Sequence, residues 1–194
     1  MTKPDQFSKD FAAYCWQPRL ARDEDVPALE ALIPISVRGL QASHYSPAQM
    51  EAALGPVFGV DRQLIRDKTY FVVKDAGGIV GCGGWSRRRS LYGSDSGRGE
   101  EDAALNPQQD AARVRAFFTH PAWARRGIGR SLMVACEKAI AEAGFRRVNI
   151  VATLPGEALY ASFGYMVAER GEIPLAGGLT LPVVRMTKAL EGSE

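Results

Sequence analysis

A glycine-rich turn flanked by arginines is the part of the sequence whose residue types point most directly to chemistry. It runs Trp123-Ala-Arg-Arg-Gly-Ile-Gly-Arg-Ser and joins a β-rich run to the most regular helical pattern in the chain. Glycines let the backbone approach a ligand closely, and a helix N-terminus offers unpaired amides at the positive end of its dipole. Arg125, Arg126 and Arg130 add positive charge around the same turn. The pattern therefore predicts a binding site for a diphosphate.

Two common phosphate-binding motifs do not fit this turn. A Walker loop is excluded because the turn lacks Gly-Lys-Ser/Thr, and a dinucleotide fingerprint is excluded because the third glycine is missing. Taken alone, the turn is also compatible with an ordinary tight strand-to-helix connection whose arginines are solvated. The surrounding elements must therefore help to decide between these interpretations.

The elements around the turn form a strand, a helix and a second strand in order. Residues 112–119 are rich in bulky and β-branched side chains, and Pro121 ends the run because proline cannot donate to a sheet ladder. After Gly127 the apolar residues recur at helical spacing, at Leu132, Ala135, Cys136, Ala139 and Ile140. Gly144 predicts the end of that helix, and residues 145–152 return to β character. This order is typical of a crossover between parallel strands.

The N-terminal half predicts a strand followed by two helices. Residues 17–22 form the strand, and the acidic turn from Asp23 with an early proline begins the first helix. Ser46-Pro47 is typical of an N-cap followed by proline at the first helical position, and this second helix should end near Gly55. We expect the segment between the two helices, residues 34–45, to be exposed.

The middle and the C-terminal parts add an antiparallel hairpin, a long loop and a final helix with two strands. Residues 68–74 and 78–86 flank the turn-forming Asp75-Ala-Gly-Gly, which predicts the hairpin. Residues 86–111 are polar and form a long excursion between strands. A short helix and two β-rich runs follow at 157–163, 165–169 and 181–186. Together these elements predict one α/β domain over residues 17–190, preceded by an extension over residues 1–16.

Composition limits the protein classes that fit. The 194 residues carry 24 Lys and Arg against 22 Asp and Glu, for a formal net charge of +2. This balance argues against nucleic acid or acidic membranes as partners. No apolar run reaches the length of about 18 residues that a membrane span requires, and the N-terminus lacks a signal-peptide pattern, so we expect a cytoplasmic protein. Cys15, Cys82 and Cys136 are expected to be reduced packing residues, with no metal site.

Three ordered segments resemble a known family. Ala124 to Gly129 has the spacing of the acetyl-CoA motif Q/R-x-x-G-x-G/A, found between a strand and a long helix. Residues 115–121 are similar to the strand that enters this motif, and Leu159-Tyr-Ala-Ser-Phe-Gly-Tyr resembles a later Y-x-x-x-G-F element. The sequence thus resembles the GCN5-related N-acetyltransferases (GNAT family). The resemblance implies a single α/β domain whose mixed, twisted and splayed sheet is flanked by helices.

The resemblance also implies roles for individual residues. It assigns the pantetheine arm of acetyl-CoA to the backbone of Phe117, Phe118 and Thr119. The diphosphate is assigned to the turn and the first helical residues, namely Arg125, Arg126, Gly127, Ile128, Gly129, Arg130 and Ser131. Tyr160 falls on the position of the tyrosine that protonates the departing CoA thiolate as a general acid. The sequence departs from the family pattern at Ala124, where Gln or Arg is usual, and at Thr153, where Asn is frequent.

The function that follows is N-acetyl transfer from acetyl-CoA to a primary amine of a small molecule or a peptide. The amine attacks directly within a ternary complex, without a covalent enzyme intermediate. A non-catalytic acyl-CoA-binding or regulatory module is the main alternative, and a general phosphate-binding α/β protein is a third. The acceptor and the general base stay open, because Glu100, Glu101 and Asp102, like Arg87-Arg88-Arg89, are expected to be solvated. Family members often dimerise, so a homodimer is also an open expectation.

Overall fold

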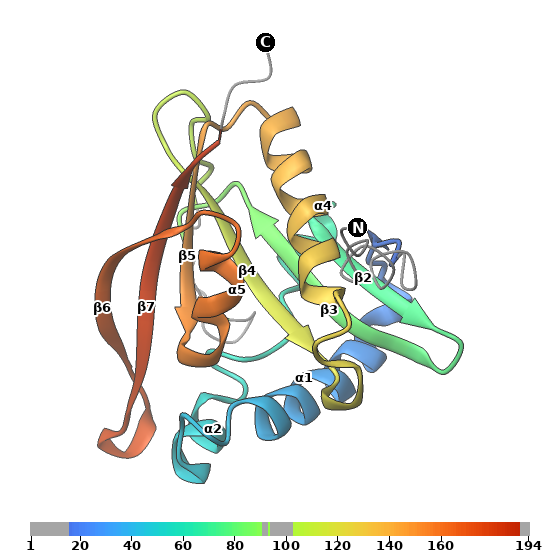
Figure 1. The fold of residues 1–194 in the computed structure, drawn as a ribbon, viewed down its shortest axis with the longest axis vertical. Coiled ribbons are helices and arrows are strands. Elements are labelled where there is room, and N and C mark those ends of the chain that lie inside the picture. The colour runs from blue at the N-terminus through green and yellow to red at the C-terminus, as the bar shows by residue number, and fades with distance from the viewer. Residues whose placement is uncertain (1–15, 91–92, 94–102, 191–194) are drawn as a thin grey trace, which may run out of the picture.

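A seven-stranded mixed sheet forms the centre of the protein, with helices on both of its faces (Figure 1). The computed structural model describes residues 16–90, 93 and 103–190. Most of the predicted N-terminal extension, and Glu100, Glu101 and Asp102 of the long loop, therefore lie outside the described residues.

The order of elements follows the predicted fold class. The strands are β1 (Arg19–Leu20), β2 (Tyr70–Asp75), β3 (Gly78–Ser86), β4 (Ala112–Thr119), β5 (Arg147–Thr153), β6 (Met166–Pro174) and β7 (Thr180–Ala189). The α-helices are α1 (Val26–Leu40), α2 (Pro47–Ala53), α3 (Arg62–Arg66), α4 (Ile128–Glu142) and α5 (Glu157–Ala161). The sheet has the order β1-β2-β3-β4-β5-β7-β6 and is not closed. The prediction of an α/β domain with a mixed sheet flanked by helices is confirmed.

Helices α1 and α4 cover opposite faces of the sheet. Val72 of β2 packs in one apolar cluster with Leu29 and Ile33 of α1, whereas the next residue, Val73, packs with Leu132 of α4. Successive side chains of a strand point to opposite faces, so each helix buries its apolar stripe against its own side. The two helices thereby hold the central strands from both sides.

Strands β4 and β5 pair over only a short stretch and then separate. Their parallel pairing covers Ala112↔Val148 to Val114↔Ile150, although both strands continue beyond it. At the point of separation Ala116 has φ 59, and the β3–β4 register shifts between Cys82 and Gly84. Such a bulge bends and twists a strand. The second half of β4 is consequently left without a sheet partner on its β5 side, as the predicted splay requires.

The expectation that residues 34–45 are exposed holds for only part of the segment. Helix α1 continues through Pro34, and the segment buries the side chains of Ser36, Val37, Gln41 and Tyr45. Proline removes one backbone donor from a helix interior. Here the burial of the apolar stripe that ends at Val37 outweighs that cost, so the helix does not stop where proline suggested.

Tyr45 fastens the segment after α1 to the C-terminal strands. Its hydroxyl donates to Pro182 O at 2.7 Å and accepts from the Leu154 amide at 2.9 Å. We expect Tyr45→Phe to lower the free energy of unfolding by about 1–3 kcal/mol, because it leaves buried backbone groups unpaired. Chemical denaturation would measure the loss. His44→Ala, at the exposed neighbouring position, is the control and should leave stability nearly unchanged; equal effects of the two changes would contradict the prediction.

Two of the cysteines are free and buried, as predicted for packing residues. Cys82 and Cys136 are fully enclosed, and burial raises the pKa of the Cys82 thiol to about 12. Cys15 lies outside the described residues. None of the helices in the described part of the chain is long and apolar enough to cross a membrane.

Candidate functional site

An elongated cavity of about 380 Å³, here called the outer cavity, occupies the wedge that opens beside β4. It extends from the turn before α4, around Gly127 and Gly129, to Tyr160 of α5. Ser36 of α1 and Gln41, the C-cap residue of that helix, line its other side. The splay of the sheet therefore creates a channel that joins the predicted diphosphate turn to the predicted catalytic tyrosine.

The N-terminus of α4 opens into the outer cavity without a side-chain cap. Gly127 is the N-cap residue, with φ 84, a left-handed conformation that glycine adopts without strain. The first backbone hydrogen bond of the helix runs from the Ser131 amide to Gly127 O, at 3.0 Å. The amides before it, from Ile128 to Arg130, have no intrahelical acceptor, as is usual in a first helical turn. This end of a 15-residue helix can therefore receive an anion.

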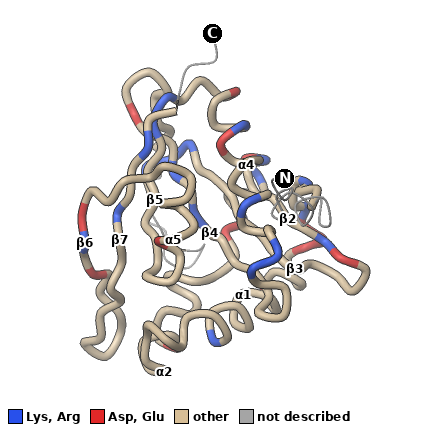
Figure 2. Tube along the Cα trace, in the orientation of Figure 1, with Lys and Arg blue, Asp and Glu red and all other residues tan. Residues whose placement is uncertain are grey.

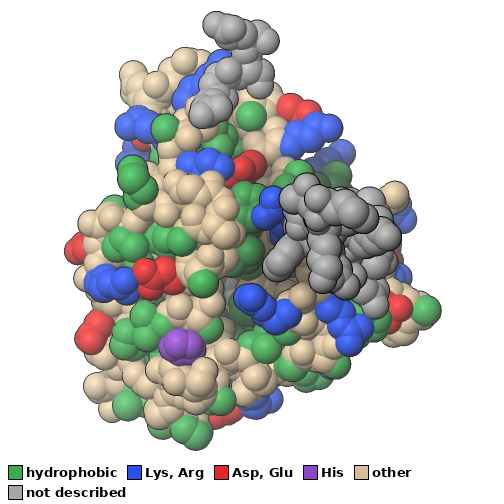
Figure 3. All heavy atoms as spheres, viewed as in Figure 1, with side chains coloured by type: hydrophobic (Ala, Val, Ile, Leu, Met, Phe, Trp, Pro, Cys, Tyr) green, Lys and Arg blue, Asp and Glu red, His purple; other side chains and the backbone are tan. Residues whose placement is uncertain are grey.

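Basic side chains surround the turn before α4. Figure 2 shows Lys and Arg positions in this turn, and Figure 3 shows basic side chains beside the hollowed part of the same face. Arg125 and Arg130 line the outer cavity. The exposed Arg126 lies over the Trp123 ring, with its Cζ atom 4.7 Å from the ring centroid. Ser131 lies further along α4, and its hydroxyl donates to Ile128 O at 2.8 Å. The predicted cationic residues thus lie together, with two of them at the cavity itself.

The half of β4 that has separated from β5 forms one wall of the wedge. Phe117 and Thr119 line the outer cavity, whereas Phe118 lies on the other face, against a second cavity. The Thr119 amide donates to Ser36 Oγ of α1 at 3.1 Å. One of the backbone groups predicted to meet pantetheine therefore has a side-chain partner from α1. Sequence reasoning missed Ser36, for which the only indication is a polar residue on an otherwise apolar helix face.

Tyr160 lies where the two cavities meet. Its side chain is 7% exposed and lines both of them, and its ring packs edge-on against Phe117 and Tyr165. Burial, with a smaller contribution from Cys136, raises the pKa of the phenol well above its ordinary value. Within the described part of the chain, no hydrogen bond involves the Tyr160 hydroxyl. Tyr160 is therefore a protonated group at neutral pH, with its hydroxyl available to a ligand.

The second cavity, here called the inner cavity, has a volume of about 80 Å³ and lies on the other side of β4. It shares Gln41, Phe117, Thr153 and Tyr160 with the outer cavity. Its remaining walls are mainly apolar and come from β4, β5, β7 and the connection between α2 and α3. Two cavities with different linings therefore meet at Tyr160.

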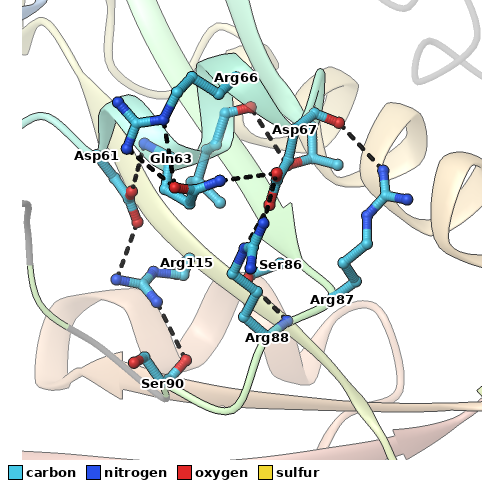
Figure 4. Close-up of polar contacts among 11 residues, drawn as sticks. Asp61, Gln63, Arg66, Asp67, Ser86, Arg87, Arg88, Ser90 and Arg115 are labelled. Carbon is cyan, nitrogen blue, oxygen red and sulfur yellow. Dashed lines mark hydrogen bonds and ion pairs between the residues drawn. The ribbon is translucent and has the colours of Figure 1, made fainter. Parts of the chain in front are cut away.

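Arg115, which lines the inner cavity, belongs to a buried ion pair (Figure 4). Arg115 of β4 lies 2.9 Å from the carboxylate of Asp61, and their side chains are 5% and 0% exposed. The Arg115 guanidinium also donates to the carbonyl oxygens of Ser90 and Gly93 in the loop after β3. The charges of Asp61 and Arg115 thus compensate each other, and Arg115 connects the long loop to the sheet.

Comparison with known proteins assigns the fold to a family. Residues 66–167, more than half of the chain, match the acetyltransferase (GNAT) domain. The chain belongs to the GNAT family. Membership makes the protein an acyltransferase, and the predicted resemblance is confirmed.

Solved structures of GNAT proteins share the fold at low sequence identity. A GCN5-related N-acetyltransferase from Rhodopseudomonas palustris matches with a TM-score of 0.67 and 21% identity, over 91% of this chain and 97% of that one. The PaiA N-acetyltransferase from Thermoplasma acidophilum, in complex with coenzyme A, matches with a TM-score of 0.60 and 14% identity, over 91% of this chain and 99% of that one. A GNAT acetyltransferase from Brucella melitensis, in complex with acetyl-CoA, matches with a TM-score of 0.55 and 15% identity, over 92% of this chain and 90% of that one. A search of curated protein sequences finds no match.

The expectation that all of Arg87-Arg88-Arg89 is solvated is wrong for one residue of this GNAT protein. Arg88 is half-buried and holds both carboxylate oxygens of Asp67, at 2.8 and 3.0 Å (Figure 4). Burial alone would raise the pKa of Asp67, but the hydrogen bonds from Arg88 and Gln63 lower it below its ordinary value. Arg88 therefore fixes the start of the long loop and is not available to an acidic acceptor.

A general base is not apparent in this GNAT domain. Of the described residues that line the two cavities, none carries a carboxylate or an imidazole. The described residues also contain no group of His, Cys, Asp or Glu arranged to hold a metal ion. His120, the residue that follows β4, accepts a hydrogen bond from the Ala122 amide at 3.2 Å through Nδ1.

Gly129 offers a direct test of the anion site in this GNAT domain. A Cβ built there would lie 3.0 Å from Leu159 Cδ2, the end of a flexible side chain, so a small side chain can be accommodated. We expect Gly129→Asp to weaken CoA binding by about tenfold or more, because a carboxylate at the helix N-terminus competes with the diphosphate. Isothermal titration with CoA would measure the change. Gly171→Asp, at an open position on β6, is the control and should leave CoA affinity unchanged.

Proposed function

We propose that this GNAT protein transfers the acetyl group of acetyl-CoA to a primary amine by direct attack within a ternary complex. The observation that carries the proposal is the path of the outer cavity. It extends from the uncapped N-terminus of α4, along the unpaired edge of β4, to Tyr160, where the inner cavity begins. A long donor and a small acceptor could thus approach Tyr160 from opposite sides.

The residues around the outer cavity fit acetyl-CoA in chemistry. Amides at the start of α4, with Arg125 and Arg130 beside them, suit the diphosphate. The unpaired edge of β4 at Phe117 suits the peptide-like pantetheine arm, because buried backbone groups need hydrogen-bond partners. Ala124 replaces the usual Gln or Arg of the motif, and the neighbouring arginines supply positive charge at the same turn.

The role of Tyr160 follows from its protonation state. When the amine nitrogen bonds to the thioester carbonyl carbon and the carbon–sulfur bond breaks, the sulfur leaves as a thiolate that needs a proton. Tyr160 supplies that proton, and its raised pKa ensures that the phenol carries it at neutral pH. The excess proton of the amine passes to solvent, and Tyr160 regains a proton from solvent before the next turnover. Holding the two reactants together contributes about 7–11 kcal/mol to lowering the barrier, so few catalytic groups are needed.

The test is to incubate the protein with acetyl-CoA and a panel of primary amines and peptides. CoA thiol release and the acetylated product, followed by mass spectrometry, are the two readouts. We expect release that depends on an amine and matches the product one to one. Acetyl-CoA binding without release for every acceptor would instead favour the non-catalytic binding module. Failure to bind acetyl-CoA would reject the donor assignment.

A further inference from the structure

The side chain of Gln41 lies at the junction of the outer and inner cavities. Gln41 ends helix α1, is 7% exposed, and lines both cavities. Its Oε1 atom is buried and has no hydrogen-bond partner among the residues that the structure describes. Buried polar atoms in proteins are nearly always hydrogen-bonded, so an unpartnered carboxamide beside a cavity indicates a place for a ligand.

The inner cavity is suited to an apolar group. Phe58, Phe118, Val151, Leu181 and Val183 contribute to its walls and belong to one apolar cluster. Among the described residues that line the cavity, Arg115 is the one with a charged side chain. It already forms an ion pair with Asp61 and hydrogen bonds to two loop carbonyls. A second ammonium group on a ligand would therefore enter without a carboxylate partner, at a large desolvation cost.

We propose that the inner cavity binds the acceptor, a primary amine with a compact apolar body and no second charge, and that Gln41 Oε1 accepts a hydrogen bond from its nitrogen. This inference rests on the proposed acetyl transfer. The carboxamide then holds the nitrogen beside Tyr160, at the point where the donor cavity ends. The apolar body fills the space between β4 and β7.

The same surroundings favour the reactive form of the amine. An apolar cavity disfavours the charged form of a bound amine and so lowers its pKa. The neutral form is the nucleophile, and it can still donate a hydrogen bond to a carboxamide oxygen. This reduces the demand for a general base. A longer acyl chain of the donor is a poorer occupant of the inner cavity, because methylene groups would leave Gln41 Oε1 unpartnered.

The first experiment compares isopentylamine with putrescine, which has a similar length but carries a second ammonium. We expect kcat/KM to be higher for isopentylamine by about tenfold or more. Equal or better use of putrescine would overturn the inference while leaving the proposed acetyl transfer intact. Hexanoyl-CoA serves as a third probe, and faster turnover with it than with acetyl-CoA would assign the inner cavity to the acyl chain instead.

The second experiment uses Gln41→Met, which keeps the side-chain volume but removes the acceptor oxygen. We expect KM for isopentylamine to rise about tenfold while KM for acetyl-CoA stays within about twofold. The exposed Gln108→Met is the matched control and should change neither constant. An unchanged amine KM in Gln41→Met would overturn the role of Gln41.

A binding measurement separates this inference from the proposed function. Isothermal titration of isopentylamine into CoA-saturated protein needs no turnover. Binding that is lost in Gln41→Met and kept in Gln108→Met supports the acceptor site even if acetyl transfer fails. No binding to the CoA-saturated wild-type protein would overturn the inference even if other amines are acetylated.

Discussion

Replacing Tyr160 by phenylalanine should lower kcat by about 10²- to 10⁴-fold, the usual contribution of a positioned general acid. The change removes the phenolic proton and keeps the ring that packs against Phe117 and Tyr165. The CoA thiolate would then leave without a local proton donor. The binding surface for acetyl-CoA is hardly altered, so its KM should stay within about twofold, since only an interaction made in the transition state is lost. Steady-state kinetics with a saturating amine would measure both constants.

Tyr165→Phe is the matched control for this prediction. Tyr165 is also buried and its ring contacts Tyr160, but it lines neither cavity. Its loss should therefore leave kcat within about threefold of the wild-type value, because no reacting atom meets it. Similar losses in both variants would show that packing, and not proton donation, explains the effect, and the role of Tyr160 would be rejected.

The pH dependence of the wild-type enzyme is a second test of Tyr160 as the general acid. Tyr160 must be protonated to act as an acid, and burial raises its pKa, so the active form persists to higher pH than an ordinary tyrosine allows. The kcat profile should therefore show no loss of activity as pH passes through about 10, the ordinary tyrosine pKa. A descending limb centred there, abolished in Tyr160→Phe, would contradict an acid shielded by burial.

Local patterns explain why the turn and the helix beside the outer cavity could be predicted from sequence. Gly127 supplies its own left-handed turn, and the helix that follows has its apolar residues in one periodic stripe. Both properties depend on residues that are neighbours in the chain. The same holds for Ser46, whose side chain caps α2 as predicted. This part of the outer cavity's lining thus follows from one strand, one turn and one helix.

The inner cavity depends on residues that are distant in sequence. Gln41 follows α1 and Arg115 lies in β4, and both line this cavity, while Asp61, just before α3, pairs with Arg115. Nothing near any of them in the sequence indicates these contacts. Helix α3 has only five residues, too few for a periodic pattern to reveal it. Pro34 suggested a helix end that tertiary packing overrides. Sequence reasoning therefore reached the fold and the turn and helix beside the outer cavity, but not the lining of the inner cavity.

The buried pair of Asp61 and Arg115 carries the second large prediction. Arg115→Met should lower the free energy of unfolding by about 3–5 kcal/mol, because it leaves the carboxylate of Asp61 buried without a cation. The double variant Asp61→Asn/Arg115→Met should recover much of this loss, since the uncompensated charge is then absent as well. Chemical denaturation of the single and double variants, analysed as a mutant cycle, would measure both effects.

Arg38→Met tests whether burial is the cause. Arg38 forms a pair with Glu51 at 2.7 Å, shorter than the buried pair, but both side chains are more than half exposed. Water screens such a pair, so its loss should hardly change stability. If Arg38→Met proved as destabilising as Arg115→Met, or if the double variant recovered nothing, then charge burial would not explain the effect. Arg115 also holds the carbonyls of Ser90 and Gly93, so we expect both Arg115→Met and the double variant to raise the KM for the amine. Only the double variant should regain stability. That separation would assign the pair two roles, stabilising the fold through its charge balance and shaping the inner cavity through the loop that Arg115 holds.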